Sequence, residues 1–514
     1  MARPRPDPDA VLVRDVDRAF TSTEVDEVVR RMARALLDLD LGPDRRIAVY
    51  ADNSAEAVLA HLGGLRAGCS VVAVNAHLAA PEAAYQLADS GARLVFVGPE
   101  HVERGVEAAA DAGLPAGSVV VWRGPADRGG ATINWNAWLA AAPEGPVPDD
   151  VRPRPNLLYT SGTTGRPKAT ELPPNVFPRV DSWPAFLEAL ERNRFAAHGQ
   201  HLVVAPLHHT GPLNAVRVLG LGVPVAILGR FDPEATLRAI DGWRVESTTL
   251  VPTHLQRLLA LPDEVKARYD VSSLQLVFQT GAACPVGVKR AMIDWWGPVF
   301  LEAYGATEVG VTCSIDSIDW LAHPGSVGRA VPPYEAVVLD DAGAPQPPDV
   351  EGRLYFRDST GRGIVYEGDP ERTAAAHAKP GTFTLGEIGR IDPDGWVYVT
   401  DRFADMVVTG GANVYPAEME QVLSEHPGVA DVAGIGVPDD DLGEVLVALV
   451  VPSNPNEPPL VGELRAWCEA RLSRYKCPRA IKLVATLDRN PLGKLDKRRL
   501  REDHAPGLAS DPPR

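Results

Sequence analysis

The sequence predicts an α/β fold: a large N-terminal domain of helix-covered, mainly parallel sheets, followed by a small α+β C-terminal domain. Three observations lead to this prediction. The chain has 514 residues, more than one hydrophobic core usually organises. Short apolar runs alternate with helical patterns, which is typical of parallel sheets. The composition changes near residues 395–405, so we expect domains at 1–401 and 402–514 with a hinge at about 401–405.

The first elements follow this alternation in order. Apolar residues recur at helical spacing over residues 17–41, and an apolar run at 47–50 predicts the strand that follows. The alternation then repeats and predicts two helices and two strands, at 54–67, 81–90, 70–74 and 92–97. Later apolar runs predict further buried strands at 201–205, 223–228, 247–250 and 274–279.

The C-terminal elements form a smaller pattern. A strand is predicted at 396–399, and polar residues follow it. The pair Tyr415-Pro416 then predicts the start of a helix, because proline is favoured in the first helical turn. Apolar runs predict strands at 429–437 and 445–451, and helical spacing predicts a helix at 460–472. These elements are enough for a compact α+β domain.

Composition excludes several classes of protein. The 51 Lys and Arg against 68 Asp and Glu give a net charge of −17. So acidic a surface repels phosphate backbones, which argues against general binding of nucleic acid or anionic membranes. Five scattered cysteines do not suit a disulfide framework or a zinc site. The first residues lack the apolar core of a signal peptide, and no run of about 18 apolar residues occurs. We therefore expect a cytoplasmic protein.

One loop is suited to hold phosphate. The segment LLYTSGTTGRPK at 157–168 runs from an apolar strand into Thr, Ser and Gly residues and then Lys168. The hydroxyls and exposed amides of such a loop can bind phosphate oxygens. It is not a Walker loop, because the Walker spacing of glycine and lysine is absent. A flexible surface loop is the alternative interpretation of these residues taken alone.

The string YTSGTTGRPK resembles the phosphate-binding loop of the adenylate-forming superfamily, which includes acyl-CoA synthetases, peptide-synthetase adenylation domains and luciferases. Further blocks of that family follow in order: PLHHTGP at 206–212, TGAA at 280–283, YGATE at 304–308, GTFTLGEIGRIDPDGW at 381–396, DRFADMVVTGGANVYPAEME at 401–420 and NPLGKLDK at 490–497. The resemblance spans roughly residues 20–500 and is closest to bacterial acyl-CoA ligases. It implies ATP (or an acyl-adenylate), Mg²⁺ and CoA as ligands, and a C-terminal domain that is mobile.

The resemblance implies a nucleotide site drawn from several of these blocks. Tyr304 would stack on adenine, Glu387 would bind the ribose hydroxyls, and Arg402 would contact ribose or phosphate. Glu308 and Thr164 would hold magnesium, which prefers oxygen ligands. The alternatives are a core tyrosine, an exposed carboxylate and a surface arginine. The full set of nucleotide-binding residues is Thr160, Ser161, Gly162, Thr163, Thr164, Gly165, Lys168, Gly281, Ala282, Ala283, Tyr304, Gly305, Glu387 and Arg402.

The resemblance also implies which residues carry the reaction. Attack of a carboxylate on the α-phosphate of ATP brings two anions together, so the site needs cations. A lysine ~4 Å from such an anion gains roughly 4 kcal/mol at an effective dielectric of ~20. The implied catalytic residues are Lys494, Glu308, Thr307 and His209. Acyl binding is implied for His208, His209, Phe278 and Gly281, CoA binding for Gly410, Gly411 and Tyr415, and a hinge role for Ala404. A solvated lysine and packed histidines are the alternatives. The neighbouring Lys497, Arg498 and Arg499 are expected to be solvated side chains.

The sequence departs from the family pattern at three places. Leu385, Gly386 and Glu387 stand where the family usually has Thr-Gly-Asp. Ala404 replaces the usual Asp or Lys of the hinge, and Ala169 replaces the glycine after Lys168. Neutral drift is one interpretation. The other is that ATP use is weakened, so that the enzyme only transfers a pre-formed acyl-adenylate to CoA.

The predicted function is an acyl-CoA ligase for an apolar carboxylic acid. The acyl-site residues show no acidic partner for a substrate amine, which disfavours amino acids. CoA is the preferred thiol, although a separate carrier protein stays open as the acceptor. A separate adenylating enzyme and a homodimer are also open. The rival classes are an inactive protein that binds nucleotide or acyl-adenylate, and a luciferase-type oxidase.

Overall fold

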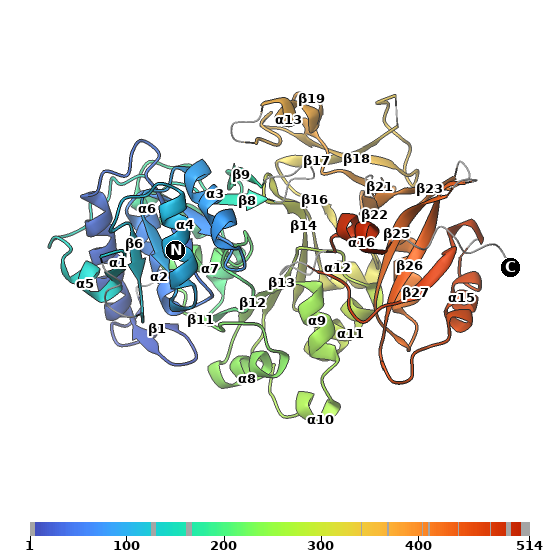
Figure 1. Ribbon diagram of the computed structural model, residues 1–514, viewed down its shortest axis with the longest axis horizontal. Coiled ribbons are helices and arrows are strands. Elements are labelled where there is room, and N and C mark those ends of the chain that lie inside the picture. Colours follow the sequence, from blue (N-terminus) through green and yellow to red (C-terminus); the bar gives the residue numbers. More distant parts are fainter. Residues whose placement is uncertain are drawn as a thin grey trace.

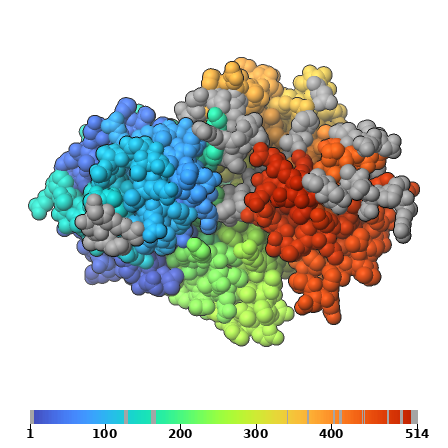
Figure 2. Space-filling model, viewed as in Figure 1, coloured from blue at the N-terminus to red at the C-terminus, as the bar shows by residue number. Residues whose placement is uncertain are grey.

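The protein is described by a computed structural model over residues 6–124, 130–160, 167–340, 342–366, 370–402, 405–409, 412–439, 442–472, 474–489 and 495–504. Four sheets follow one another across the molecule (Figure 1). In Figure 2 the N-terminal part is blue, the middle of the chain is green and yellow, and the C-terminal part is orange and red. The predicted mixture of helices with parallel-rich sheets is confirmed.

The first sheet has the strand order β7-β6-β5-β3-β4-β8-β9 among the described residues. Apart from the antiparallel β8–β9 pair, its strands run parallel. Its strands are β3 (Arg46–Tyr50), β4 (Ser70–Val74), β5 (Val95–Val97), β6 (Val119–Val121), β7 (Ile133–Asn134), β8 (Leu157–Thr160) and β9 (Lys168–Glu171). Its helices are α1 (Ser22–Leu37), α2 (Ala55–Arg66), α3 (Ala80–Ser90), α4 (Val102–Asp111) and α5 (Trp135–Ala140), with a 3-10 turn at Pro99–His101.

Both faces of this sheet are buried, as the continuous apolar strands predict. Ile47 and Val49 pack into one core with α1 and α2, whereas Ala48 and Tyr50 pack into another with α3 and α4. Successive side chains of a strand point to opposite faces, so a strand covered on both sides needs apolar residues throughout. The predicted helix at 17–41 is shorter than expected because Thr21 forms a capping box with Glu24 and fixes its start.

The second sheet has the strand order β16-β15-β14-β13-β12-β10-β11-β1-β2. The strands from β1 to β14 in this order run parallel, and antiparallel pairs close both ends. Its strands are β1 (Val11–Arg14), β2 (Ala19–Thr21), β10 (His201–Val203), β11 (Val225–Ile227), β12 (Ser247–Leu250), β13 (Leu276–Gln279), β14 (Phe300–Ala306), β15 (Gly310–Asp316) and β16 (Arg329–Ala330). Its helices are α6 (Trp183–Leu190), α7 (Asn214–Gly220), α8 (Pro233–Trp243), α9 (Pro252–Leu259), α10 (Asp263–Lys266), α11 (Val286–Trp296) and α12 (Ser317–Ala322), with a 3-10 turn at Arg194–Ala197.

The third sheet is antiparallel wherever the structure describes it, and the sequence pattern did not reveal this. The alternation of strands and helices, expected throughout the long N-terminal part, stops at about β16. The sheet contains β17 (Tyr334–Leu339), β18 (Gly352–Asp358), β19 (His377–Lys379), β20 (Thr382–Phe383), β21 (Glu387–Ile391) and β22 (Val397–Arg402), and α13 (Pro370–Ala375) precedes β19.

The last sheet has the strand order β24-β23-β26-β25, and β27 pairs with β26. Its strands are β23 (Val407–Thr409), β24 (Ala412–Val414), β25 (Val429–Asp439), β26 (Gly443–Pro452) and β27 (Ala480–Leu483). Its helices are α14 (Pro416–Ser424), α15 (Val461–Glu469) and α16 (Lys497–His504), with a 3-10 turn at Arg474–Lys476. The α+β pattern predicted for this part is therefore observed, and the predicted helix at 460–472 is shorter.

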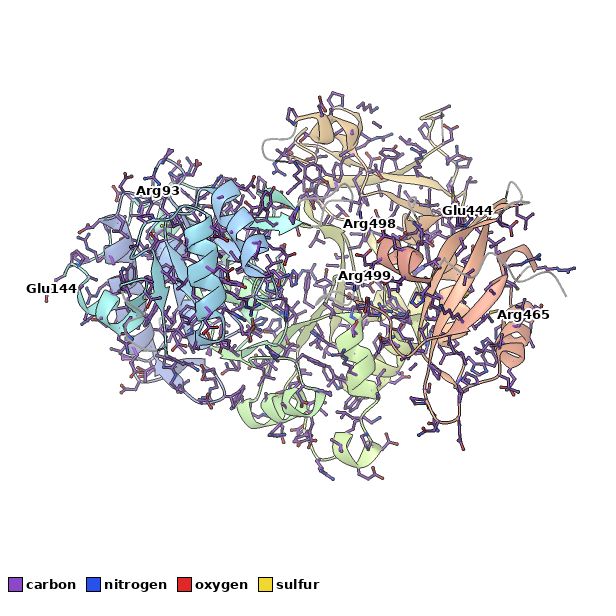
Figure 3. The ribbon with its side chains drawn as sticks, viewed as in Figure 1. Arg93, Glu144, Glu444, Arg465, Arg498 and Arg499 are labelled. Atoms are coloured by element: carbon purple, nitrogen blue, oxygen red, sulfur yellow. The ribbon has the colours of Figure 1, made fainter. Side chains whose placement is uncertain are left out.

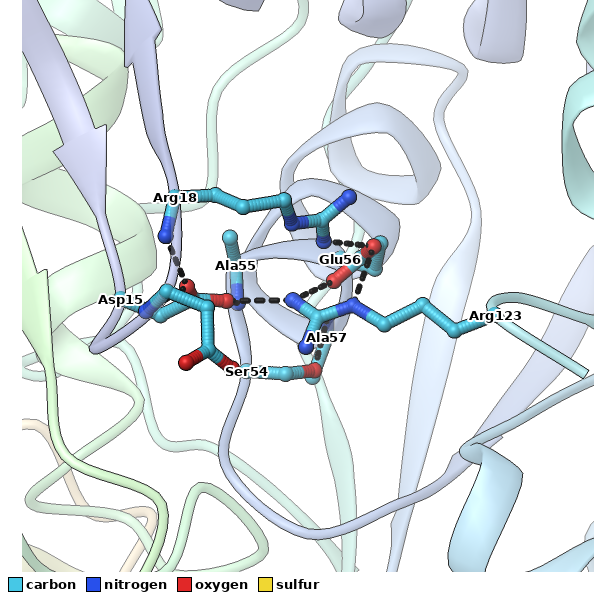
Figure 4. Close-up of polar contacts among 8 residues, drawn as sticks. Asp15, Arg18, Ser54, Ala55, Glu56, Ala57 and Arg123 are labelled. Atoms are coloured by element: carbon cyan, nitrogen blue, oxygen red, sulfur yellow. Dashed lines mark hydrogen bonds and ion pairs between the residues drawn. The ribbon is translucent and has the colours of Figure 1, made fainter.

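A cluster of charged side chains holds the β1–β2 hairpin on α2 (Figure 4). Arg123 donates to Glu56 through Nε at 3.0 Å and Nη2 at 2.9 Å, and it also pairs with Asp15. Arg18 pairs with the same carboxylate of Glu56, which is 4% exposed. Buried carboxylates need such partners, because an unpaired charge is costly away from water. The cluster fixes the edge of the second sheet against the first sheet's helices.

Candidate functional site

The predicted motifs lie at the carboxyl ends of neighbouring parallel strands. The PLHHTGP segment follows β10, the TGAA turn follows β13, and YGATE spans the end of β14. Strands β10, β12, β13 and β14 run parallel in this order, so their carboxyl ends meet at one edge. This edge is where open α/β sheets bind ligands.

Direct hydrogen bonds join these motifs. Thr210 Oγ1 lies 3.1 Å from Thr307 Oγ1 and links the histidine segment to YGATE. Thr280 Oγ1 donates to the Ala303 carbonyl at 3.1 Å. Gly281, next to Thr280, has φ +100°, a conformation that glycine adopts without strain. The structure therefore brings three of the predicted motifs together.

Tyr304 and Glu387 meet although they come from different sheets. Tyr304 Oη donates a 2.8 Å hydrogen bond to Glu387 Oε2, which connects the end of β14 with the start of β21. Both side chains are half-buried. Gly305 follows, and a Cβ there would lie 1.9 Å from the Gly310 carbonyl oxygen, so only glycine fits this hairpin. The residues predicted to bind adenine and ribose are therefore adjacent.

Glu308 provides a carboxylate at the same edge. Glu308 is 8% exposed, and its backbone carbonyl accepts a hydrogen bond from Arg362 Nη1 at 3.2 Å. Thr307 precedes Glu308 in the chain, and its hydroxyl lies within hydrogen-bond distance of the Thr210 hydroxyl. Among the described residues no group of three or more His, Cys, Asp or Glu could hold a metal by itself. One carboxylate among hydroxyls suits Mg²⁺ that also binds substrate phosphates.

His208 and His209 form a pair with ring centroids 4.2 Å apart. Burial, together with the neighbouring His209 and His77, holds the pKa of His208 well below its usual value. His208 is therefore neutral at pH 7 and can only offer hydrogen bonds. Behind it lies a cavity of about 10 Å³, lined among others by His61, whose pKa burial lowers to about 3. The buried position of His61 had no sequence signal beyond its place in an apolar helix.

Phe278, one of the residues predicted to bind the acyl group, lies on the face of the second sheet that adjoins the histidine segment. Phe278 lies in β13 opposite Thr249 of β12, and its ring contacts Phe195 edge-on at 5.7 Å. A Cβ on Gly211 would lie 3.3 Å from the Thr249 side chain, so this face continues directly below the histidine segment. Arg217 of α7 was missed from sequence, although a single arginine inside the apolar run NAVRVLG was a usable signal.

Several predicted residues fall outside the part of the chain that the structure describes: Ser161, Gly162, Thr163, Thr164, Gly165, Ala404, Gly410, Gly411 and Lys494. Thr160 and Arg402 end β8 and β22, and Arg402 lies opposite Glu387 in the register. Lys168 opens β9, paired with Thr160. Ala282 is half-buried and Ala283 exposed in the turn after β13, and Tyr415 precedes α14.

The departures from the family pattern have local explanations where the structure describes them. Ala169 lies in β9 opposite Tyr159, and an extended strand accepts alanine as well as glycine. Leu385 packs against the core of the third sheet. The preceding Thr384 hydroxyl accepts from the Gly386 amide at 3.0 Å, so a hydroxyl is present one residue earlier.

Comparison with known proteins decides the family. The family model described as "AMP-binding enzyme" matches residues 2–363, and the model described as "AMP-binding enzyme C-terminal domain" matches residues 418–494. The chain belongs to the AMP-binding enzyme family. It is an AMP-forming acid–thiol ligase of the acyl-CoA synthetase type, as the motifs predicted. Members of this family use ATP and CoA.

Full-length relatives support this assignment. A feruloyl-CoA synthase from an Amycolatopsis species is 34% identical and covers 97% of this chain and 97% of the relative. An indoleacetate–CoA ligase from Aromatoleum aromaticum is 31% identical and covers 96% and 95%. The solved structure of amide bond synthetase McbA from Marinactinospora thermotolerans has a TM-score of 0.80 at 27% identity and covers 96% and 97%. No helix within the described ranges has the length and apolarity to span a bilayer.

Proposed function

We propose that this member of the AMP-binding enzyme family is a cytoplasmic acyl-CoA ligase for a carboxylic acid with an apolar body. The acid's carboxylate attacks the α-phosphate of ATP, giving acyl-AMP and pyrophosphate. The CoA thiol then attacks the acyl carbon, giving the thioester, AMP and a proton. The observation that carries the proposal is the meeting of Tyr304, Glu387, Thr307 and Thr210 at one edge of a parallel sheet.

The nucleotide would lie across the two sheets at this edge. Tyr304 offers an aromatic face for adenine, and Glu387 offers oxygens for the ribose hydroxyls. Thr307 and the phosphate loop at 160–168 would bind phosphate oxygens. Glu308 would hold Mg²⁺, which supplies positive charge near the phosphates when bound. Lys494 would bring a second cation to the reacting carboxylate.

The acid would lie between the histidine segment and the sheet face below it. Neutral His208, whose ring lies beside that of His209, can orient a carboxylate by hydrogen bonding without holding it as an ion pair. Phe278 and Phe195 give apolar walls for the body of the acid. Feruloyl, indoleacetyl and long-chain fatty acyl groups, named for the relatives, all share such an apolar body. Residues 1–401 and 402–514 would act as two domains that reorient about 401–405 between the half-reactions.

A second candidate is an enzyme that performs only the thioester step. The specific observation in its favour is Glu387, whose longer side chain is held by Tyr304 where the family resemblance implies aspartate. The additional methylene of glutamate moves the carboxylate by ~1.5 Å, and shifts near 1 Å can cost ~100-fold in rate. Such an enzyme would need a separate adenylating partner. A homodimer and a carrier-protein acceptor are compatible with either candidate.

Product detection by mass spectrometry distinguishes these functions. Purified protein is given a panel of carboxylic acids with ATP, Mg²⁺ and CoA, and in parallel synthetic acyl-adenylates with CoA. Acyl-CoA from acid and ATP is the expected result. Acyl-CoA from the adenylates alone would establish the second candidate. Lys494→Ala should abolish adenylation, whereas Lys379→Ala, at an exposed lysine of β19, is the matched control. Ligand binding without any thioester would contradict both candidates.

A further inference from the structure

Helix α7 carries a positive charge inside the fold. Arg217 is 3% exposed and lies between the buried Val216 and Val218. Burial lowers the pKa of its guanidinium to about 10, so the group stays charged at pH 7. A buried charge is costly unless a counter-charge or a full set of hydrogen bonds compensates it. The surroundings of Arg217 should therefore contain such a partner.

The described residues do not provide one. Arg217 Nη2 donates to Asn214 Oδ1 at 3.3 Å, but Nε and Nη1 have no acceptor among the described residues. Asn214 Oδ1 is already shared with Asn193 Nδ2 at 2.7 Å, and Asn214 Nδ2 also lacks an acceptor there. Another deeply buried cation, Lys289, is by contrast paired with the carboxylate of Glu302. Native proteins rarely leave so many buried donors without acceptors.

Arg217 lies on the helix that follows the histidine segment of the proposed acyl site. Helix α7 begins directly after the histidine segment, and its Val218 packs in one cluster with Phe278 and Phe195. Phe278 lies opposite Thr249 in the register, and Thr249 lies directly below Gly211. The Thr249 hydroxyl is another buried group without a hydrogen-bond partner among the described residues. The region behind the histidine segment is therefore apolar with a few buried donors, and not uniformly apolar as the sequence suggested.

We propose that the acid activated by this enzyme is a dicarboxylic acid, whose second carboxylate accepts hydrogen bonds from Arg217 and Asn214. The proposal rests on the acyl-CoA ligase function proposed above and specifies the far end of its substrate. Phe278, Phe195 and Val218 would contact the apolar spacer between the two carboxylates. A neutral acceptor such as a ketone could fill the hydrogen bonds, but it would leave the charge of Arg217 uncompensated. An anion satisfies both requirements.

The test compares acids that differ only at the far end. Aliphatic and aromatic dicarboxylic acids and their monomethyl esters, matched in length, are supplied with ATP, Mg²⁺ and CoA, and kcat/KM for the thioester is measured. We expect a preference for the diacid of about 10- to 100-fold, the usual effect of hydrogen bonds to a charged group. Arg217→Met should remove or reverse this preference. Arg46→Met is the control, because Arg46 in β3 is also largely buried but bonds to the Ser90 carbonyl.

For variants that lose activity or stability, binding of the acid is measured instead of turnover. The shift in melting temperature on adding diacid or monoester, in the presence of AMP, should be larger for the diacid in the unaltered protein. Arg217→Lys, which keeps the charge, should retain part of the difference. Equal or weaker kcat/KM and thermal shifts for diacids than for monoesters would overturn the proposal and leave the ligase function standing. A failure of the ligase function would instead appear as no thioester from any acid.

Discussion

The phenol of Tyr304 is hydrogen-bonded to the carboxylate of Glu387, with 2.8 Å between Oη and Oε2. This bond joins two sheets, because Tyr304 lies in β14 and Glu387 begins β21. It also fixes the carboxylate that would bind ribose beside the ring that would stack on adenine. The longer glutamate side chain therefore has a defined position, held by the phenol of Tyr304.

Removing this bond should weaken nucleotide binding. Tyr304→Phe keeps the aromatic face but leaves Glu387 without its phenol donor. A hydrogen bond to a charged group contributes about 1.5–3 kcal/mol, so the Kd for AMP should rise by about 10-fold or more. Calorimetric titration with AMP measures this. Tyr398→Phe, in β22 beside Arg390, is the matched control, and an AMP affinity unaltered by Tyr304→Phe would exclude a role for the bond.

The sequence predicted the fold where side-chain periodicity determines structure. The strands at 70–74 and 247–250 match β4 and β12 residue for residue, because buried parallel strands are continuous apolar runs. The antiparallel sheet from β17 to β22 was not anticipated, since its strands vary in length and bury one face only in part. Pairing depends on residues far apart in the chain, which periodicity does not report.

The site shows the same division. Motif order placed Tyr304, Glu387 and Thr307 in one site, but the fold was needed to show the bond of Tyr304 to Glu387 and that of Thr307 to Thr210. Lys497 was interpreted as a solvated lysine, and this was wrong: its side chain is 11% exposed and pairs with Glu420 at 2.9 Å. The basic residues that follow Lys497 in the sequence do not indicate that a carboxylate of another helix lies beside it. Arg217 was missed for a related reason, because its environment is made by residues from several elements.

Breaking the buried ion pair of α11 and β14 should be strongly destabilising. Lys289 is fully buried and pairs with Glu302, whose pKa is raised by burial. Lys289→Met leaves a carboxylate without its counter-charge, at a cost of about 3–5 kcal/mol. The double variant Lys289→Met with Glu302→Leu should recover much of that loss, since no buried charge remains. Urea unfolding measures both, and equal losses in the single and double variants would contradict this account.

Stability should fall as the pH is lowered below about 6.5. Burial lowers the pKa of His61, His201 and His254 to about 3 each. These groups are neutral in the fold but bind protons in the unfolded chain, whose histidines have pKa values of about 6.5. Their stabilising contribution is therefore complete above that value and is lost progressively toward pH 3, at roughly 1 kcal/mol per histidine by pH 5.5.

The measurement is the midpoint of urea unfolding at pH 7.5 and 5.5. His254→Gln should reduce the difference between the two midpoints, because one titrating group is gone. His323→Gln, outside this buried set, is the control and should leave the difference unaltered. A midpoint that is equal at both pH values in the unaltered protein would show that the buried histidines do not couple folding to protonation.

The last prediction concerns three successive basic residues of α16. Lys497 is buried against Glu420, whose Oε1 also accepts from the Gly434 amide at 2.6 Å, whereas Arg498 and Arg499 are mostly exposed (Figure 3). Burial opposes the charge of Lys497, but Glu420 and the nearby Asp401 and Asp405 together raise its pKa. Lys497→Met should therefore destabilise the C-terminal part by about 2–4 kcal/mol, because Glu420 keeps a buried charge without its cation.

Arg498→Met is the matched control for this change. Its side chain is 72% exposed and its ion pair with Glu502 spans 3.8 Å, so its loss should alter stability by less than about 0.5 kcal/mol. Urea unfolding compares the two variants. Because the pKa of Lys497 is raised, its contribution is complete below the unfolded value of about 10.5 and is lost only as the pH rises through the folded value. The effect of Lys497→Met should therefore be the same at pH 7 and 9, and a loss that depends on pH in that range would point to another group.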